Sequence, residues 1–150
     1  MGNYHYIIAG LPELVLNADN KSFSYDAVRE SIYYSSDDMD RRLIEWFDFG
    51  TSEENLTSHF YRAAFRNKCR FIRHWFALDL EIRNRKVDFV AGKMGRDASQ
   101  YKVATECNVD LGLTEEQLQK LSGIFANKNI LEKEQLLDKF KWDYISGLNE

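Results

Sequence analysis

The run of residues 56–94 is the feature that most constrains the fold of this chain. Apolar and aromatic side chains recur along it at helical spacing, and its second part carries two neighbouring stripes. The first stripe comprises Phe71, Trp75, Leu78, Ile82 and Phe89, and the second comprises Ile72, Phe76, Leu80, Val87 and Val90. On a wheel of about 100° per residue the two stripes leave only about a third of the circumference polar. We therefore expect a long central helix over residues 67–92, with Asn67 as a candidate break from a shorter helix before it.

Local signals predict further helices on the N-terminal side of this run. Ser24 is a favourable N-cap for a helix over residues 25–34, and a second helix is expected to begin after Ser35 or Ser36. Residues 4–9 are aromatic and β-branched, which favours an extended conformation. We expect this segment to pack along helices as a short extended piece.

Two more helices are expected on the C-terminal side. Thr114 and Gln117 have the spacing of a capping box, which predicts a helix that continues to about Phe125. A last helix is expected over residues 130–146. The predicted fold class is therefore mainly α, a helical bundle around one long central helix with a short extended N-terminal segment.

Composition bounds the class of protein. The chain has 150 residues, of which 44% are hydrophobic and 14% aromatic, enough to form one packed domain and too much apolar surface for a disordered chain. No apolar run approaches the ~20 residues that cross a bilayer. The two cysteines, Cys69 and Cys107, lack a CxxC spacing and cannot form a disulfide framework, which favours a reducing cytoplasm. We expect a single helical domain over residues 1–150.

Charge is distributed unevenly along the chain. The net charge is −4, but residues 62–96 carry +7 and the remainder carries −11. Such asymmetry indicates a face that meets an acidic partner, or acidic parts of the same domain. The candidate partner-binding basic face comprises Arg66, Lys68, Arg70, Arg73 and Arg85. An acidic chain lacks the positive balance typical of nucleic-acid binding, so we expect no nucleic-acid partner.

Asp79 and Arg83 fall inside the apolar arc of the long helix, four residues apart. A buried charge needs a partner, so we predict that they form a structural ion pair. An alternative is an enzyme of unrecognised type that uses Asp79 or Glu81 as a base. The chain has no glycine-rich phosphate loop, nucleophile elbow or HExxH motif, so we expect no catalytic residue, cofactor or metal site. A third hypothesis is an RNA-binding helical domain that uses the basic residues of segment 62–96.

Five segments carry a resemblance to a known family. They are residues 4–12 (YHYIIAGLP), 75–84 (WFALDLEIRN), 93–97 (KMGRD), 110–113 (DLGL) and 136–142 (LLDKFKW). Together they resemble an uncharacterised bacterial family encoded among V-type ATP synthase genes, which looks like the C or d subunit of rotary V-type ATPases. The chain departs from that family in having Asp79 in place of a glutamate and Glu81 in place of a polar amide.

The resemblance implies a non-catalytic coupling subunit that links the central stalk of a V-type ATPase to its membrane ring during ion transport. Its partners would be the stalk and ring subunits, with no direct membrane insertion. It would be cytoplasmic and held at the inner membrane through the complex. The resemblance also implies that the chain is the N-terminal part of a longer protein, which would leave an exposed apolar patch at Phe140, Tyr144 and Leu148.

Overall fold

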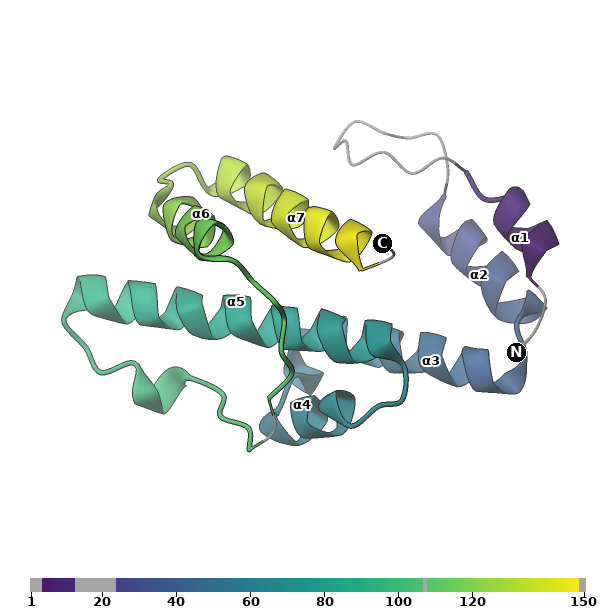
Figure 1. Ribbon diagram of the computed structural model, residues 1–150, viewed down its shortest axis with the longest axis horizontal. Coiled ribbons are helices and arrows are strands. Elements are labelled where there is room, and N and C mark those ends of the chain that lie inside the picture. The colour runs from purple at the N-terminus through teal and green to yellow at the C-terminus, as the bar shows by residue number, and fades with distance from the viewer. Residues whose placement is uncertain (1–3, 13–23, 107, 149–150) are drawn as a thin grey trace. The chain divides into compact units, whose positions relative to one another are not determined.

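Helices account for all regular structure in residues 4–12, 24–106 and 108–148, the ranges that the computed structural model describes. This confirms a mainly α fold with one long helix at the centre of its packing (Figure 1). The chain divides into two units, residues 1–52 and residues 53–150. Each unit is described by itself, and a single domain over the whole chain stays a prediction.

The first unit contains three helices, α1 (His5–Ala9), α2 (Tyr25–Ser35) and α3 (Asp38–Phe49). The predicted cap of α2 is confirmed, because the Ser24 hydroxyl oxygen accepts a hydrogen bond from the Ala27 N–H at 3.4 Å. The expectation of an extended segment over residues 4–9 is wrong. A lone strand would leave its backbone groups unpaired, whereas the α1 turn pairs them locally, as in the 2.9 Å bond from the Ile8 N–H to the Tyr4 carbonyl.

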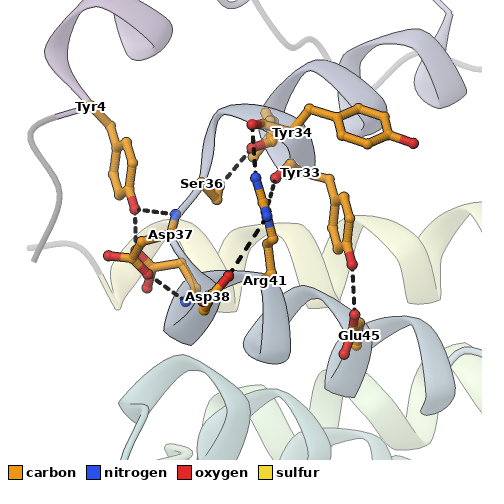
Figure 2. Close-up of polar contacts among 10 residues, drawn as sticks. Tyr4, Tyr33, Tyr34, Ser36, Asp37, Asp38, Arg41 and Glu45 are labelled. Atoms are coloured by element: carbon orange, nitrogen blue, oxygen red, sulfur yellow. Dashed lines mark hydrogen bonds and ion pairs between the residues drawn. The ribbon is translucent and has the colours of Figure 1, made fainter.

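Tyr4 connects the start of α1 to the start of α3 (Figure 2). Its hydroxyl donates to Asp40 Oδ2 at 2.6 Å and accepts from the Asp37 N–H at 3.1 Å. Asp37 is the N-cap of α3, and its carboxylate accepts from the Asp40 N–H at 2.9 Å. The Asp37 carboxylate therefore satisfies a backbone donor of α3, while the Asp40 carboxylate accepts from Tyr4.

Arg41 and Tyr33 connect α2 to α3 (Figure 2). The Arg41 guanidinium donates to the carbonyls of Tyr33 and Tyr34 at 2.9 and 3.0 Å, which lie in the last turn of α2. The Tyr33 hydroxyl donates to Glu45 of α3 at 2.7 Å. The two Arg41 contacts provide donors to carbonyl groups in the last turn of α2, where donors from a following turn are missing.

The second unit is built around α5. Its elements are η1 (Glu53–Asn55), α4 (Ser58–Phe65), α5 (Arg70–Met94), η2 (Ser99–Tyr101), α6 (Glu115–Ala126) and α7 (Ile130–Gly147). Figure 1 shows α4 on one side of α5 and the pair α6 and α7 on the other. The break at Asn67 is confirmed, since its side-chain oxygen accepts from the Cys69 N–H at 2.8 Å in the turn between α4 and α5. The capping box of Thr114 and Gln117 is also confirmed.

The two apolar stripes of α5 serve different neighbours. Phe76 belongs to the second stripe and packs edge-to-face on Phe60 of α4, with ring centroids 4.9 Å apart. Leu78 and Ile82 belong to the first stripe and join a core with α6 and α7. The residues that α6 and α7 contribute to that core are Leu121, Ile124, Phe125, Leu137 and Phe140. α5 is therefore packed on two sides, as its wheel predicts.

Gly95 ends α5 in the left-handed conformation, with φ of 62°. We expect Gly95→Ala to lower the free energy of unfolding by about 1 to 2 kcal/mol, because a Cβ disfavours this conformation. Gly92→Ala is the matched control. Gly92 lies within α5 with open space around its Cα, so alanine there should raise helix propensity and stabilise the protein slightly. Urea unfolding measures both variants, and equal stabilities for the two would contradict the expectation.

Candidate functional site

Asp79 lies where side chains of three helices of the second unit meet. Tyr61 of α4 donates its hydroxyl hydrogen to Asp79 Oδ2 at 2.7 Å, and Lys141 Nζ of α7 lies 3.9 Å from Oδ1. Tyr61 is fully buried, whereas about a quarter of the Asp79 side chain is exposed. Arg83, one turn further along α5, donates to the Leu56 carbonyl at 3.4 Å. The carboxylate thus connects α4, α5 and α7.

The Tyr61 hydroxyl interacts with the charges of both Asp79 and Arg83. Burial raises the pKa of Tyr61 well above its usual value, the Asp79 carboxylate raises it further, and Arg83 opposes both effects. Tyr61 therefore keeps its proton at neutral pH and acts as a hydrogen-bond donor. Both Asp79 and Arg83 thus act on Tyr61. A direct ion pair between Asp79 and Arg83 stays a prediction.

Glu81, the other carboxylate considered as a base, lies in a different environment. Its Oε1 accepts from Arg85 Nε at 2.6 Å, and both side chains are more than a third exposed. This is an ion pair between residues four apart on one helix face. Lys141 makes a second contact beside Asp79, with its ammonium 5.9 Å from the centre of the Trp75 ring. Lys141 of α7 thus contacts both a carboxylate and an aromatic ring of α5, whereas the Glu81–Arg85 pair lies within α5.

The predicted basic face divides into two parts. Its members are Arg66, Lys68, Arg70, Arg73 and Arg85. The first four lie in the turn between α4 and α5 or in the first turn of α5, where Arg73 donates to the carbonyls of Asn67 and Lys68 at 2.7 and 2.8 Å. Arg85 lies about 22 Å from Arg70 along the axis of α5 and pairs with Glu81. We use the name "basic turn" for Arg66, Lys68, Arg70 and Arg73.

Two aromatic residues lie beside the basic turn. Phe71 and Trp75 stack on each other, with ring centroids 6.1 Å apart and planes at 10°. Their spacing predicts burial, but Phe71 is 39% exposed because it lies on the first turn of α5. Trp75 is half-buried.

The predicted exposed patch at Phe140, Tyr144 and Leu148 is wrong at Phe140. Phe140 is 4% exposed and belongs to the core, and Tyr144 packs against the same core. Leu148 is half-buried. The reason is that α7 packs back on α6, which turns the face that carries residues 137, 140 and 144 toward α5.

Sequence reasoning missed a polar contact made by His74. The Tyr144 hydroxyl donates to the Leu111 carbonyl at 3.0 Å, so it accepts the hydrogen bond from His74 Nδ1 at 2.9 Å. This joins α5, α7 and the segment before α6. Burial lowers the pKa of His74, as do Arg70 and Arg73, while Asp110 opposes them. No local pattern around His74 signals a partner 70 residues away.

Comparison with known families finds a match over residues 48–149, about two-thirds of the chain, to the family described as "Protein of unknown function (DUF2764)". The chain belongs to this family. The match takes in nearly all of the second unit, including α5 and the Asp79 contacts, while residues 4–12 lie outside it. No curated protein and no solved structure matches the chain.

In residues 4–12, 24–106 and 108–148, no three His, Cys, Asp or Glu side chains gather so that they could hold a metal ion. None of the helices in the same ranges combines the length and apolar character that a membrane crossing requires.

In the DUF2764 chain, we expect Tyr61→Phe to lower the free energy of unfolding by about 1 kcal/mol, because Asp79 loses a buried donor. Combined with Asp79→Ala, the loss should be less than the sum of the single variants by about 0.5 kcal/mol or more. Tyr101→Phe, at a tyrosine that is 56% exposed, is the control and should change little. Additive losses in urea unfolding would contradict the contact.

Stability should depend on pH through His74. The unfolded chain binds a proton on this residue near the usual pKa of 6.5, and the folded protein binds it only at lower pH. Protonation therefore favours unfolding. Above about pH 6.5 His74 does not lower the free energy of unfolding, and as the pH drops below this value its protonation lowers that free energy progressively. We expect His74→Gln to flatten the slope of unfolding free energy between pH 7 and 5. An identical slope in both proteins would contradict this role.

Proposed function

We propose that this chain is a non-catalytic structural subunit of a V-type ATPase that contributes to the link between the central stalk and the membrane ring. The proposal starts from the resemblance of five segments to a family encoded among V-type ATP synthase genes. Four of these segments, residues 75–84, 93–97, 110–113 and 136–142, fall within the residues that match DUF2764. The role of this chain in ion transport would then be mechanical, and its partners would hold it at the membrane.

The contacts of Asp79 are the observation on which the proposal rests. A catalytic carboxylate has to be available to a substrate, whereas Asp79 already accepts from Tyr61 and faces Lys141. Arg83 is likewise directed to the Leu56 carbonyl. The half-buried charges of α5 thus fix the positions of neighbouring helices, which is what a subunit that transmits force between two partners requires.

The basic turn is the surface that we assign to the acidic parts of those partners. Lys68 and Arg70 are exposed, whereas Arg73 is half-buried and directed to backbone carbonyls. Positive charge on a rim residue contributes mainly to the rate and orientation of association. Lys68 and Arg70 are therefore the residues to change without disturbing the turn itself.

Affinity capture of the tagged protein from its native membranes tests the proposal. We expect stalk and ring subunits of the V-type ATPase to be recovered with it. Lys68→Glu with Arg70→Glu should reduce that recovery by about tenfold, because it places like charges against an acidic partner. Lys120→Glu with Lys128→Glu changes the charge equally at exposed positions on α6 and the turn after it, and should leave recovery unchanged.

Circular dichroism of both variants should match the parent protein, so that lost capture reflects the surface and not the fold. Failure to recover any stalk or ring subunit, while the ATPase is intact in the same extract, would overturn the proposed function. Equal capture by both charge variants would remove the basic turn from the interface.

A further inference from the structure

A groove in the second unit runs along the C-terminal half of α5. It has a volume of about 560 Å³. We use the name "floor" for its apolar and aromatic lining, which consists of Val87, Val90, Ala91 and Met94 of α5 with Tyr101 of η2. Val90, Met94 and Tyr101 are 45%, 57% and 56% exposed. Neighbouring large apolar side chains gathered in one hollow are typical of a binding site for another molecule.

The charged residues that line this groove are mainly basic. We use the name "rim" for them, and they are Arg83, Lys86 and Arg96, with Glu53 as the acidic member. Among the described residues, neither Lys86 nor Arg96 has an acidic group within 4.0 Å. The other acid nearby on α5, Asp88, is paired with Lys102 at 2.9 Å. The rim therefore presents positive charge that the described part of the chain does not neutralise.

The dimensions of the groove suit a helix. From Arg83 to Met94 the face of α5 extends about 16 Å, the length of three helical turns. A helix with apolar residues along one stripe would cover the floor, and acidic residues beside that stripe would face the basic rim. Nucleic acid would satisfy the rim but would place charged phosphates against Val90 and Met94.

We propose that this groove docks an acidic amphipathic helix of a partner protein. Its apolar side chains pack on Val90, Met94 and Tyr101, and its carboxylates face Lys86 and Arg96. This proposal does not depend on the proposed role in a V-type ATPase, because it is argued only from the floor and the rim of the groove.

Two fluorescent helical peptides test the proposal with the full-length protein. Both carry the same leucine stripe over three turns, and one has glutamate and the other lysine at the flanking positions. We expect the glutamate peptide to bind about tenfold more tightly in fluorescence anisotropy, with a difference that decreases as salt is added. Lys86→Glu with Arg96→Glu should reverse the preference between the peptides.

Met94→Glu tests the floor, and Met39→Glu is its matched control, since Met39 of α3 is also exposed, at 76%. Met94→Glu should weaken binding of the glutamate peptide by about tenfold, because it places a charge among apolar side chains and repels the peptide. Met39→Glu should leave binding unchanged.

Equal affinities for the two peptides, or equal binding by the Met94→Glu and Met39→Glu variants, would overturn the proposal. Self-association in analytical ultracentrifugation that Met94→Glu abolishes would instead assign the groove to a second copy of the chain. Tighter binding to phosphatidylserine vesicles or to single-stranded RNA than to the glutamate peptide, lost in Met94→Glu, would likewise overturn it.

Discussion

Burial of α5 on two sides is the constraint on which the second unit depends. Phe76 packs on Phe60 of α4, while Leu78 and Ile82 contact the core of α6 and α7. If either side of α5 lost its neighbours, an apolar stripe would be exposed to water, at a free-energy cost of about 25 cal/mol per Å² of apolar area. The helices on both sides are therefore needed together, although they are separated along the chain by α5 and the segment that follows it.

The polar contacts of the unit follow from this arrangement. Because neighbours pack on two sides of α5, side chains at the edges of its apolar stripes are within reach of other elements, as Asp79 is of Tyr61. Asn84 of α5 likewise contacts another segment: its side-chain amide donates to the Val103 carbonyl at 2.9 Å and accepts from the Val103 N–H at 3.0 Å. That pair fixes the segment after α5, which carries Tyr101 of the groove. One helix thus positions both the charged framework and the surface proposed to bind a partner.

What could be predicted from the sequence was governed by local physics. The capping box at Thr114 and the stripes of α5 depend on residues within a few positions of one another. The capping box was predicted correctly, and so was the burial of Leu78 and Ile82, whereas Phe71 and Val90 of the same stripes are 39% and 45% exposed. The burial of Phe140 depends on how α7 packs back on α6, and the partner of Asp79 comes from an earlier helix. Ala77 shares a helix face with Arg73 and Glu81, each one turn away, yet it is 6% exposed, so tertiary packing extends further around α5 than hydrophobicity indicates. Such contacts have no signal in the local pattern.

Hydrogen exchange of the full-length protein, followed by mass spectrometry, tests the central role of α5 most directly. If α5 is the element around which the second unit folds, its middle turns from Phe76 to Ile82 should exchange most slowly in the chain, through global unfolding alone. The helices α4, α6 and α7 should lose their protection in the same transition when urea is added. Exchange of these α5 amides as fast as those of α2, which has no buried residue, would contradict the account.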